Sequence, residues 1–459
     1  MSRLYSPRDI TESALCIGCG SCVAQAGDAT AHMRFDAYGQ LKPGGDKAWF
    51  NTPTERFTRT CPFSPEAKNE DQLAIALYPA AEHKDEALGR FQTAYVGYVA
   101  EEDFRMQGSS GRLVTWVATE LMRQGLIDGV AHVIPVEDPQ QDGRFFKYTI
   151  STTEEAIRAG AKSRYYPIEL AEVLQLIQNT PGRYAVVGIP CFIKAIQLLR
   201  KEDPLIRERI PYTLGLFCGH MKSARFIESF AWQMNVPIQQ VQKVEFRLKD
   251  ASRPANWYNA QLTLANGTRV NRDWWNLADG DWGAGHFMNN ACNYCDDVVG
   301  ETADISFGDA WVEPYSSDGR GTNVVVVRSA VVDKLISDAI EKGRLTLQAV
   351  SSDFVADTQA AGFRQRREGL AYRLSWHKGG VKPRKRVKAD AERPTRRRKL
   401  IYRMRYLITA ASHRVFNTAR KFNTPQLYIK WARNAEKVYH GLAYHRGKIG
   451  AFVKRLGLD

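Results

Sequence analysis

The sequence predicts an α/β protein whose core is a mixed sheet with covering helices. A small N-terminal region precedes this core, and a basic, helical C-terminal extension follows it. Short β-rich runs alternate with helical segments through the middle of the chain, which is typical of an α/β sheet. Four cysteines and many turn formers mark the first 85 residues, and positive charge is concentrated in the last part.

Length and composition favour a globular protein of several domains. The 459 residues suffice for about two to four domains. We expect three, over residues 1–85, 86–350 and 351–459. With 44% hydrophobic and 25% charged residues, the composition is that of an ordinary globular protein. No run of about 18 apolar residues suggests a membrane span, and the polar start lacks a signal-peptide pattern, so a cytoplasmic location is expected.

The core region should contain six strands, four helices and a hairpin. The strands are expected at residues 93–99, 130–136, 183–189, 212–217, 304–307 and 323–328. The helices are expected at residues 112–124, 168–178, 192–201 and 223–234. A hairpin is indicated where Asn266-Gly267 separates residues 258–264 from 268–271, because Asn-Gly favours a tight turn between two strands.

The C-terminal extension supplies all of the excess positive charge. From residue 381 onward it has 22 lysines and arginines and 4 acidic residues, a net charge of +18, which leaves −4 for the rest. After a linker at 379–394, helices are expected at 396–412 and 426–438. A solvated extension packed on the body, a membrane-surface helix and an acidic partner all remain open. Nucleic-acid binding is not favoured, because no recognised module accompanies the charge.

The first cysteine group has the spacing of an iron–sulfur site. Cys16, Cys19 and Cys22 form Cys-x-x-Cys-x-x-Cys, and Cys61 is followed by Pro62. Three thiolates at this spacing can bind three corners of a 4Fe–4S cluster, and a distant Cys-Pro is typical of the fourth. The alternative is zinc, which usually takes two separated Cys-x-x-Cys pairs. We therefore expect a ferredoxin-like iron–sulfur region over residues 1–85.

The second cysteine group is less specific. Cys292 and Cys295 form one Cys-x-x-Cys, which fits zinc, a dithiol or a cluster. Cys191 and Cys218 each follow an expected strand, and the carboxyl ends of parallel strands meet at one edge of a sheet. These thiols could therefore face one site. The alternative is that Cys191 and Cys218 are small buried hydrophobic residues.

A glycine- and serine-containing loop precedes the first expected core helix. Its residues are Gly108, Ser109, Ser110, Gly111 and Arg112. Backbone amides and hydroxyls at a helix start can bind phosphate, because the helix dipole favours anions there. The loop is neither a P-loop nor Gly-x-Gly-x-x-Gly, so a plain tight turn is an equally good interpretation.

Several charged residues could belong to a cofactor or substrate site. Asp309 follows an expected strand and could form a polar wall, or belong to a solvated acidic loop. His220 could donate a proton, although a single histidine is more often structural. Lys162, Arg164 and Lys222 could hold an anionic group or lie on the surface.

Together these segments resemble the coenzyme F420 hydrogenase/dehydrogenase beta-subunit family, whose members include 7-hydroxymethyl chlorophyll a reductase and proteins from polysaccharide gene clusters. The resembling stretches are 16–22 with 61–62, 108–128, 162–165, 187–191, 215–219, 292–296 and 303–311. The resemblance implies an α/β core that binds FAD and one or two 4Fe–4S clusters.

The resemblance also implies residue roles. The second cluster would be bound by Cys191, Cys218, Cys292 and Cys295. The loop Gly108, Ser109, Ser110 and Gly111 would bind FAD phosphate. Apart from the resemblance, Arg112, Thr115, Lys162 and Asp309 are further candidate FAD-binding residues, and His220 and Lys162 are the candidate catalytic residues. Arg112 departs from the family, since many relatives have glycine there.

The expected function is therefore an iron–sulfur flavoprotein oxidoreductase. Electrons would pass from a donor such as ferredoxin through the clusters to FAD and on to an organic substrate. One alternative is a non-catalytic electron-transfer subunit of a larger redox complex, and another is a zinc-stabilised interaction protein with a basic tail. The expected location is cytoplasmic, and a peripheral position at the membrane through the tail stays open.

Overall fold

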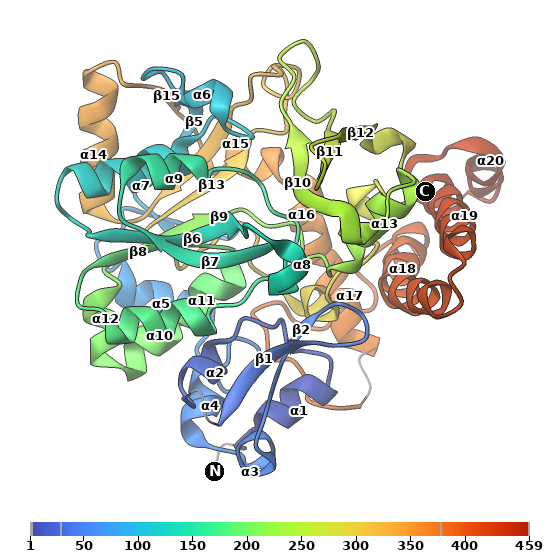
Figure 1. The fold of residues 1–459 in the computed structure, drawn as a ribbon, viewed down its shortest axis with the longest axis horizontal. Helices are drawn as coiled ribbons and strands as arrows, with labels where there is room; N and C mark the ends of the chain where they lie inside the picture. Colours follow the sequence, from blue (N-terminus) through green and yellow to red (C-terminus); the bar gives the residue numbers. More distant parts are fainter. Residues whose placement is uncertain (1–2, 28–29, 377–378, 458–459) are drawn as a thin grey trace.

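An eight-stranded mixed sheet lies at the centre of the computed structural model, which describes residues 3–27, 30–376 and 379–457 (Figure 1). Its strand order is β15-β5-β14-β13-β9-β8-β6-β7. The strands are β5 (Thr93–Val99), β6 (Gly129–Pro135), β7 (Phe146–Ser151), β8 (Tyr184–Gly188), β9 (Tyr212–Leu216), β13 (Ile305–Asp309), β14 (Asn323–Val327) and β15 (Leu345–Ala349). The mixed sheet is confirmed, and all six expected core strands belong to it.

Five of these strands point the same way. β6, β8, β9 and β13 pair in parallel, and β5 matches them because β14 runs antiparallel to both β13 and β5. The edge strands β7 and β15 are antiparallel to their neighbours. The loops that follow the five parallel strands therefore gather at one edge of the sheet, where α/β proteins bind ligands.

Helices cover both faces of the sheet (Figure 1). One face carries α7 (Leu113–Arg123), α9 (Glu154–Ala159) and α14 (Ala330–Glu341), and the other carries α10 (Ala171–Asn179), α11 (Pro190–Glu202) and α12 (Pro204–Arg209). Trp116 of α7 and Ile336 of α14 pack against sheet residues such as Leu214. Phe192 of α11 and Leu174 of α10 pack on the opposite face. Two apolar layers thus enclose the sheet.

The N-terminal region is built from short elements. They are α1 (Pro7–Glu12), α2 (Ser21–Ala24), β1 (Ala31–Phe35), β2 (Leu41–Gly45), α3 (Lys47–Asn51), α4 (Glu55–Thr60), α5 (Glu70–Leu77), β3 (His83–Asp85) and β4 (Gly89–Phe91). Ile10, Leu15 and Phe57 of this region share one hydrophobic cluster with Leu174 and Phe192 of the core helices. The region is therefore held against α10 and α11 by apolar packing.

A second, three-stranded antiparallel sheet lies beside the main one. It consists of β10 (Val241–Leu248), β11 (Asn259–Leu264) and β12 (Arg269–Asp273), with α13 (Arg225–Gln233) packed nearby. The hairpin expected at Asn266-Gly267 is confirmed, and Gly267 has the positive φ of +83° that the turn requires. β10 was not expected from the sequence. Short helices α6 (Phe104–Gln107) and α8 (Pro139–Asp142) complete the core.

Six helices follow the core: α15 (Ser352–Thr358), α16 (Ala360–Arg366), α17 (Glu368–Trp376), α18 (Arg396–Lys421), α19 (Pro425–Tyr444) and α20 (Gly447–Arg455). α18 and α19 form an antiparallel pair at the periphery (Figure 1). Phe416 of α18 stacks on Trp232 with ring centroids 4.2 Å apart, and Tyr428 of α19 packs on Phe287. Aromatic residues of the extension therefore pack on the body. None of the described helices is long and apolar enough to cross a membrane.

Candidate functional site

The first four cysteines line one cavity. Cys16, Cys19 and Cys22 come from the loop between α1 and α2, and Cys61 ends α4. The other walls of this cavity are largely apolar. The structure thus brings together the thiols that the spacing grouped.

The glycines between these cysteines are required by the local backbone. Gly18 and Gly20 have φ values of +81° and +78°, a region that L-residues with a side chain rarely adopt. A Cβ atom on Gly20 would lie 2.7 Å from Oε2 of Glu169 and 2.9 Å from the backbone nitrogen of Ala171. The loop can therefore follow this path against α10 only with glycine at that position.

Burial makes three of these thiols hard to ionise. Desolvation raises the pKa of the Cys19 thiol to about 11, and it also raises the pKa values of Cys22 and Cys61. Repulsion from neighbouring thiolates adds to the shift at each position. A cationic centre would remove this penalty, because metal binding supplies the opposite charge and displaces the thiol protons.

The other four cysteines line a second cavity. Cys191 is the second residue of α11, just beyond β8, and Cys218 follows β9. Cys292 and Cys295 come from the 3-10 turn η4 (Asn290–Tyr294) and its C-terminal residue. The placement of Cys191 and Cys218 beyond two parallel strands directs them to one site, as the sequence led us to expect.

Arg366, the last residue of α16, lines the second cavity. Its Nη1 lies 2.7 Å from Sγ of Cys295, and its Nη2 donates to the carbonyl oxygens of Cys218 at 2.7 Å and Gly219 at 2.8 Å. Burial alone would lower the pKa of Arg366, but the thiols of Cys295 and Cys218 outweigh it and raise the pKa. The side chain is therefore a permanent buried cation beside two cysteines.

A network of buried ions surrounds this second site. Asp296 and Glu301, each about 1% exposed, accept hydrogen bonds from Arg386 at the start of the extension. Lys385 pairs with Asp296 at 3.4 Å. Burial opposes the ionisation of Asp296, but Lys385 and the neighbouring arginine lower its pKa below its ordinary value. The loop around Cys295 is thereby fastened to the C-terminal extension.

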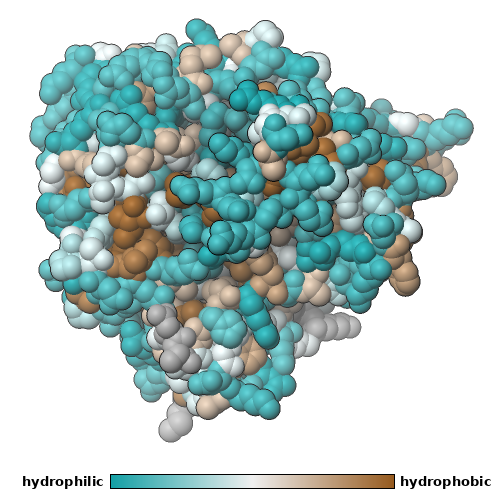
Figure 2. Space-filling model, viewed as in Figure 1, coloured by the Kyte–Doolittle hydropathy of each residue, from teal (hydrophilic) through white to brown (hydrophobic). Residues whose placement is uncertain are grey.

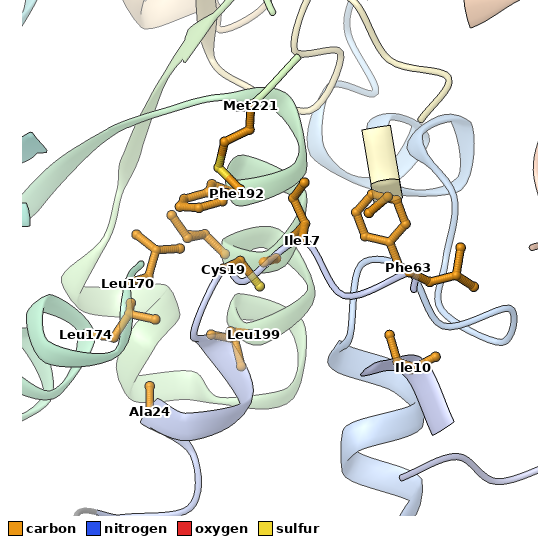
Figure 3. Close-up of a cluster of buried hydrophobic side chains, with 14 of the residues drawn as sticks. Ile10, Ile17, Cys19, Ala24, Phe63, Leu170, Leu174, Phe192, Leu199 and Met221 are labelled. Carbon is orange, nitrogen blue, oxygen red and sulfur yellow. The ribbon is translucent and has the colours of Figure 1, made fainter. Parts of the chain in front are cut away.

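The two cysteine cavities are neighbours. Ile17 and Phe63 line both of them, so these two side chains form a shared wall. Figure 3 shows Ile17 between Cys19 and Phe63, with Met221 of the second cavity close by. Groups bound in the two cavities would be separated by little more than this apolar wall.

The Gly108–Gly111 loop lies at the same edge of the sheet, directly before α7. Ser109 Oγ accepts a hydrogen bond from the backbone N–H of Ser163 at 3.0 Å, which joins the loop to residues 162–164. Within the described residues, the backbone N–H groups of Ser109, Ser110 and Gly111 make no hydrogen bond. These three unpaired amides lie in the loop just before the 11-residue helix α7 and offer donors to an anion.

Two other residues proposed for the flavin site lie on α7 or directly before it. Arg112 adopts φ +65° and turns its guanidinium into the protein, where it donates to the carbonyl oxygens of Phe104 at 3.3 Å and Arg158 at 2.7 Å. Burial lowers the pKa of Arg112 to about 10. Thr115 is buried on α7. Arg112, which stands where the family resemblance leads us to expect glycine, thus supports the Gly108–Gly111 loop from the side of the protein interior.

The remaining candidate residues are engaged by neighbours. Lys162 pairs with Glu245 at 2.6 Å, and Asp309 pairs with Arg247 at 2.8 Å. His220 is buried and stacks on Trp282, with ring centroids 4.2 Å apart and Nε2 without a hydrogen-bond partner. Burial lowers the pKa of His220 well below its ordinary value, so this imidazole is neutral. His220 and Lys162 make no hydrogen bond to each other.

The other two cations considered for anion binding are also enclosed. The Arg164 guanidinium lies 5.0 Å from the ring centre of Phe146. Lys222 donates to the carbonyl oxygen of His286 at 2.6 Å, and burial lowers its pKa to about 7. Neither is a free surface charge.

Sequence reasoning missed three residues of the second site: Arg366, Lys385 and Arg386. The basic runs that contain them are visible in the sequence, but they were interpreted as part of a tail. A run of basic residues does not by itself indicate which partner it meets, because most such runs are solvated.

Two family models and one curated relative match parts of this chain. The model of the coenzyme F420 hydrogenase/dehydrogenase beta subunit N-terminal part matches residues 94–175, and that of the C-terminal part matches residues 182–353. An uncharacterized protein of Methanocaldococcus jannaschii is 26% identical over 250 residues, which is 52% of this chain and 61% of that protein. The match therefore spans less than two thirds of that relative.

A chain of the F420-reducing nickel–iron hydrogenase complex from Methanosarcina barkeri is similar in structure. It is 18% identical, the match covers 66% of this chain and 99% of that chain, and the TM-score is 0.49. Arg366, Lys385 and Arg386 lie beyond the segments that the two family models match.

Proposed function

Because the chain belongs to the coenzyme F420 hydrogenase/dehydrogenase beta-subunit family, a family of redox subunits, we propose that it is an iron–sulfur flavoprotein oxidoreductase. Electrons enter from a donor such as ferredoxin, pass through two 4Fe–4S clusters to FAD, and reach an organic substrate. The observation that carries this proposal is the pair of four-thiol cavities separated by a shared apolar wall.

The spacing of the thiols favours clusters over zinc. Among the described residues, no three cysteines have sulfur atoms that all lie within 4.8 Å of one another. A tetrahedral zinc with bonds of about 2.3 Å needs its sulfurs about 3.8 Å apart. A cubane separates its cysteine ligands further, because each thiolate binds a different iron atom. The zinc-stabilised alternative therefore fits the geometry less well.

The chain's own residues define how the clusters would be held. Cys16, Cys19, Cys22 and Cys61 would bind the first cluster, and Cys191, Cys218, Cys292 and Cys295 the second. Each cluster supplies one-electron transfer when bound. The walls around both sites are largely apolar, and Arg366 donates a hydrogen bond to the sulfur of Cys295.

The Gly108–Gly111 loop supports the proposed FAD site. Its unpaired amides, the dipole of α7 and the nearby Lys249, which donates to the carbonyl oxygen of Ser110 at 3.0 Å, favour a phosphate at this point. Thr115 and Asp309 would support this site from α7 and β13. FAD would supply the conversion of single electrons into hydride transfer. Of the side chains proposed for proton handling, Lys162 fits better than the buried, neutral His220.

Anaerobic purification with iron, sulfide and flavin analysis tests the proposal. We expect a brown protein with about eight irons and about eight sulfides per chain, together with one FAD. Cys61→Ser and Cys191→Ser should each lose one cluster, and the two variants should lose different reduced-state EPR signals. Fewer than about four irons per chain, or a colourless protein with stoichiometric zinc, would reject the cluster assignment.

The alternative of a non-catalytic electron-transfer subunit needs a separate measurement. An enzyme should reduce an organic acceptor by itself once dithionite has reduced its clusters. A chain that carries clusters and flavin but transfers electrons only within a stable complex with another protein would support the subunit interpretation instead.

A further inference from the structure

The helices α18, α19 and α20 carry an unusual charge for a folded hairpin. Residues 396–456 contain 16 lysines and arginines but only one acidic residue, Glu436. Glu436 faces the body, where it accepts a hydrogen bond from the backbone N–H of Asp281. In the described part of the chain, carboxylates pair with Arg398, Lys399 and Arg420. The outer surface of these helices is therefore strongly cationic.

The same helices expose large apolar side chains. Of the 17 exposed large hydrophobic residues in the described chain, eight lie here: Leu400, Leu407, Phe422, Leu427, Tyr444, Ile449, Phe452 and Leu456. Single exposed hydrophobic residues are ordinary, but a concentration of them marks an interaction surface. Figure 2 shows hydrophilic and hydrophobic residues interleaved at the right-hand edge, where Figure 1 places these helices.

Helical spacing orders these side chains on α20. Ile449, Phe452 and Leu456 stand at positions i, i+3 and i+7, so they form one stripe. Lys448 and Arg455 lie next to this stripe, on its solvent side. The buried residues Gly450 and Val453 lie on the neighbouring side of the helix, next to Ile449. Phe452 and Leu456, which are 61% and 55% exposed, thus face outward, although a helix that only packs on its own protein would turn its apolar residues inward.

α18 repeats the arrangement over a longer distance. Leu400 and Leu407, which is 61% exposed, are seven residues apart and share one face. Arg396, Arg403 and Arg414 are spaced to form an adjacent stripe along the same outer face. The inner face carries the buried Ile408 and Phe416. Both helices therefore present cations beside exposed apolar residues, while their inner faces remain packed on the body.

We propose that α18, α19 and α20 dock this chain on an anionic membrane surface. At the boundary of a bilayer, cations meet lipid phosphates while apolar side chains enter the region of the acyl chains. A nucleic acid would neutralise the cations but would leave Phe452 and Leu456 in water. The interleaving of both kinds of side chain favours lipid. This inference does not rest on the proposed redox function.

Vesicle flotation with the full-length, cofactor-loaded protein tests the proposal. We expect binding to phosphatidylcholine vesicles that contain about 30% phosphatidylglycerol, and no binding to phosphatidylcholine alone. Raising the salt from about 0.1 M to about 0.5 M should weaken the binding. The double variant Phe452→Ser, Leu456→Ser should lower the partition coefficient about tenfold or more, because it removes most of the apolar stripe of α20. Lys448→Gln with Arg455→Gln should also lower it.

Matched variants control for general surface effects. Ile75→Ser with Leu176→Ser removes two exposed apolar residues of the body, and Lys334→Gln with Lys342→Gln removes two exposed lysines near α14. Both should bind vesicles as the parent does. Circular dichroism and gel filtration check that every variant is folded.

Three results would overturn the proposal. One is an absence of binding to the anionic vesicles. Another is full binding by the Phe452→Ser, Leu456→Ser variant, because it would show that charge attraction alone accounts for the binding. The third is preferential binding of a fluorescent DNA duplex, at equal salt, that depends on Lys448 and Arg455.

Discussion

The guanidinium of Arg366 is placed to influence the second proposed cluster more than any other cation. It is buried, it lies 2.7 Å from Sγ of Cys295, and it carries a full positive charge. A reduced cluster is more negative than an oxidised one, so a nearby cation and a hydrogen bond to sulfur stabilise the reduced state. Arg366 should therefore raise the reduction potential of this cluster.

We expect Arg366→Lys to lower that potential slightly and Arg366→Met to lower it further, by about 59 mV or more, which is a tenfold change for one electron. EPR-monitored potentiometry measures both clusters in one sample, and the first cluster should not change. Arg367→Met is the matched control, because Arg367 donates to the carbonyl oxygen of Asp296 and not to a thiol. An unchanged second potential in the Met variant would show that Arg366 acts only in packing.

Gly20 gives a second prediction for a single residue. Gly20→Ala would require a left-handed backbone with a Cβ atom, which costs roughly 1–2 kcal/mol, and the Cβ would also press on α10. We expect loss of the first cluster with retention of the second, measured as about four irons per chain. Gly27→Ala is the control, because Gly27 also has positive φ but its Cβ would meet no atom within 4 Å.

Predictability from sequence differed sharply between residues. The first four cysteines could be grouped from their spacing alone, because cluster geometry restricts it, whereas the other four were grouped through their places after strands and the family resemblance. Arg366 could not be identified, because its role depends on a contact 71 residues away in sequence. Arg112 was identified only as a departure from family glycine. Its actual contacts, with carbonyl oxygens on two other segments, leave no sequence signature.

Among the elements, α19 is joined to the body by titrating groups. Nε2 of His440 lies 2.7 Å from Oδ2 of Asp281, and this bond raises the pKa of His440. Burial raises the pKa of Glu436, one turn earlier, to about 7. Both groups hold protons in the folded state at pH values where the unfolded chain has lost them. Their contribution to stability must therefore fall as the pH rises through this range.

We expect this contribution to be complete below about pH 4.5 and to decline as the pH rises from there through about 7, as Glu436 and His440 lose their protons. The parent protein's melting temperature should therefore fall with rising pH relative to a Glu436→Gln, His440→Gln variant. Thermal unfolding from pH 5 to pH 8 measures this difference, and a constant offset between the two proteins would contradict it. Glu436 and His440 together should contribute about 1 kcal/mol or less to the free energy of unfolding, because both side chains are partly solvated.

Strands were predicted best where both of their faces are buried. β14 is buried at every position, and such apolar runs are recognisable in a sequence. Among the core strands, β7, β10 and β15 were missed. β15 is an edge strand with mostly exposed side chains, and β10 has exposed and buried positions interrupted by bulges. Their hydrophobic alternation is too irregular to distinguish them from loops.

Across the whole molecule, the important relation is between the two cysteine cavities. Because Ile17 and Phe63 line both, two reduced clusters would lie close enough for their electron spins to interact. We expect the EPR spectrum of the fully reduced protein to be broader than the sum of two isolated signals. Cys61→Ser, which removes the first cluster, should give the simple spectrum of the second cluster alone. Additive spectra would show that the clusters are magnetically isolated.

The arrangement of the N-terminal region could not have been derived from the sequence. The cysteine spacing predicted a centre in that region, but not its packing on α10 and α11 through Ile10, Leu15 and Phe57. Apolar residues indicate that a surface will be buried without indicating which other surface covers it. The adjacency of the two cavities therefore became visible only in three dimensions.

The ion network around the second cavity has a consequence for how the protein is made. All four cysteines of this cavity have been synthesised by residue 295, whereas Arg366, Lys385 and Arg386 follow 71 to 91 positions later. At about 5–20 residues per second, a ribosome takes roughly 4 to 18 seconds to add them. During that interval the nascent chain has the four cysteines of this cavity but not the side chains that close it, which would leave the proposed cluster site open to an iron–sulfur donor until the final helices arrive.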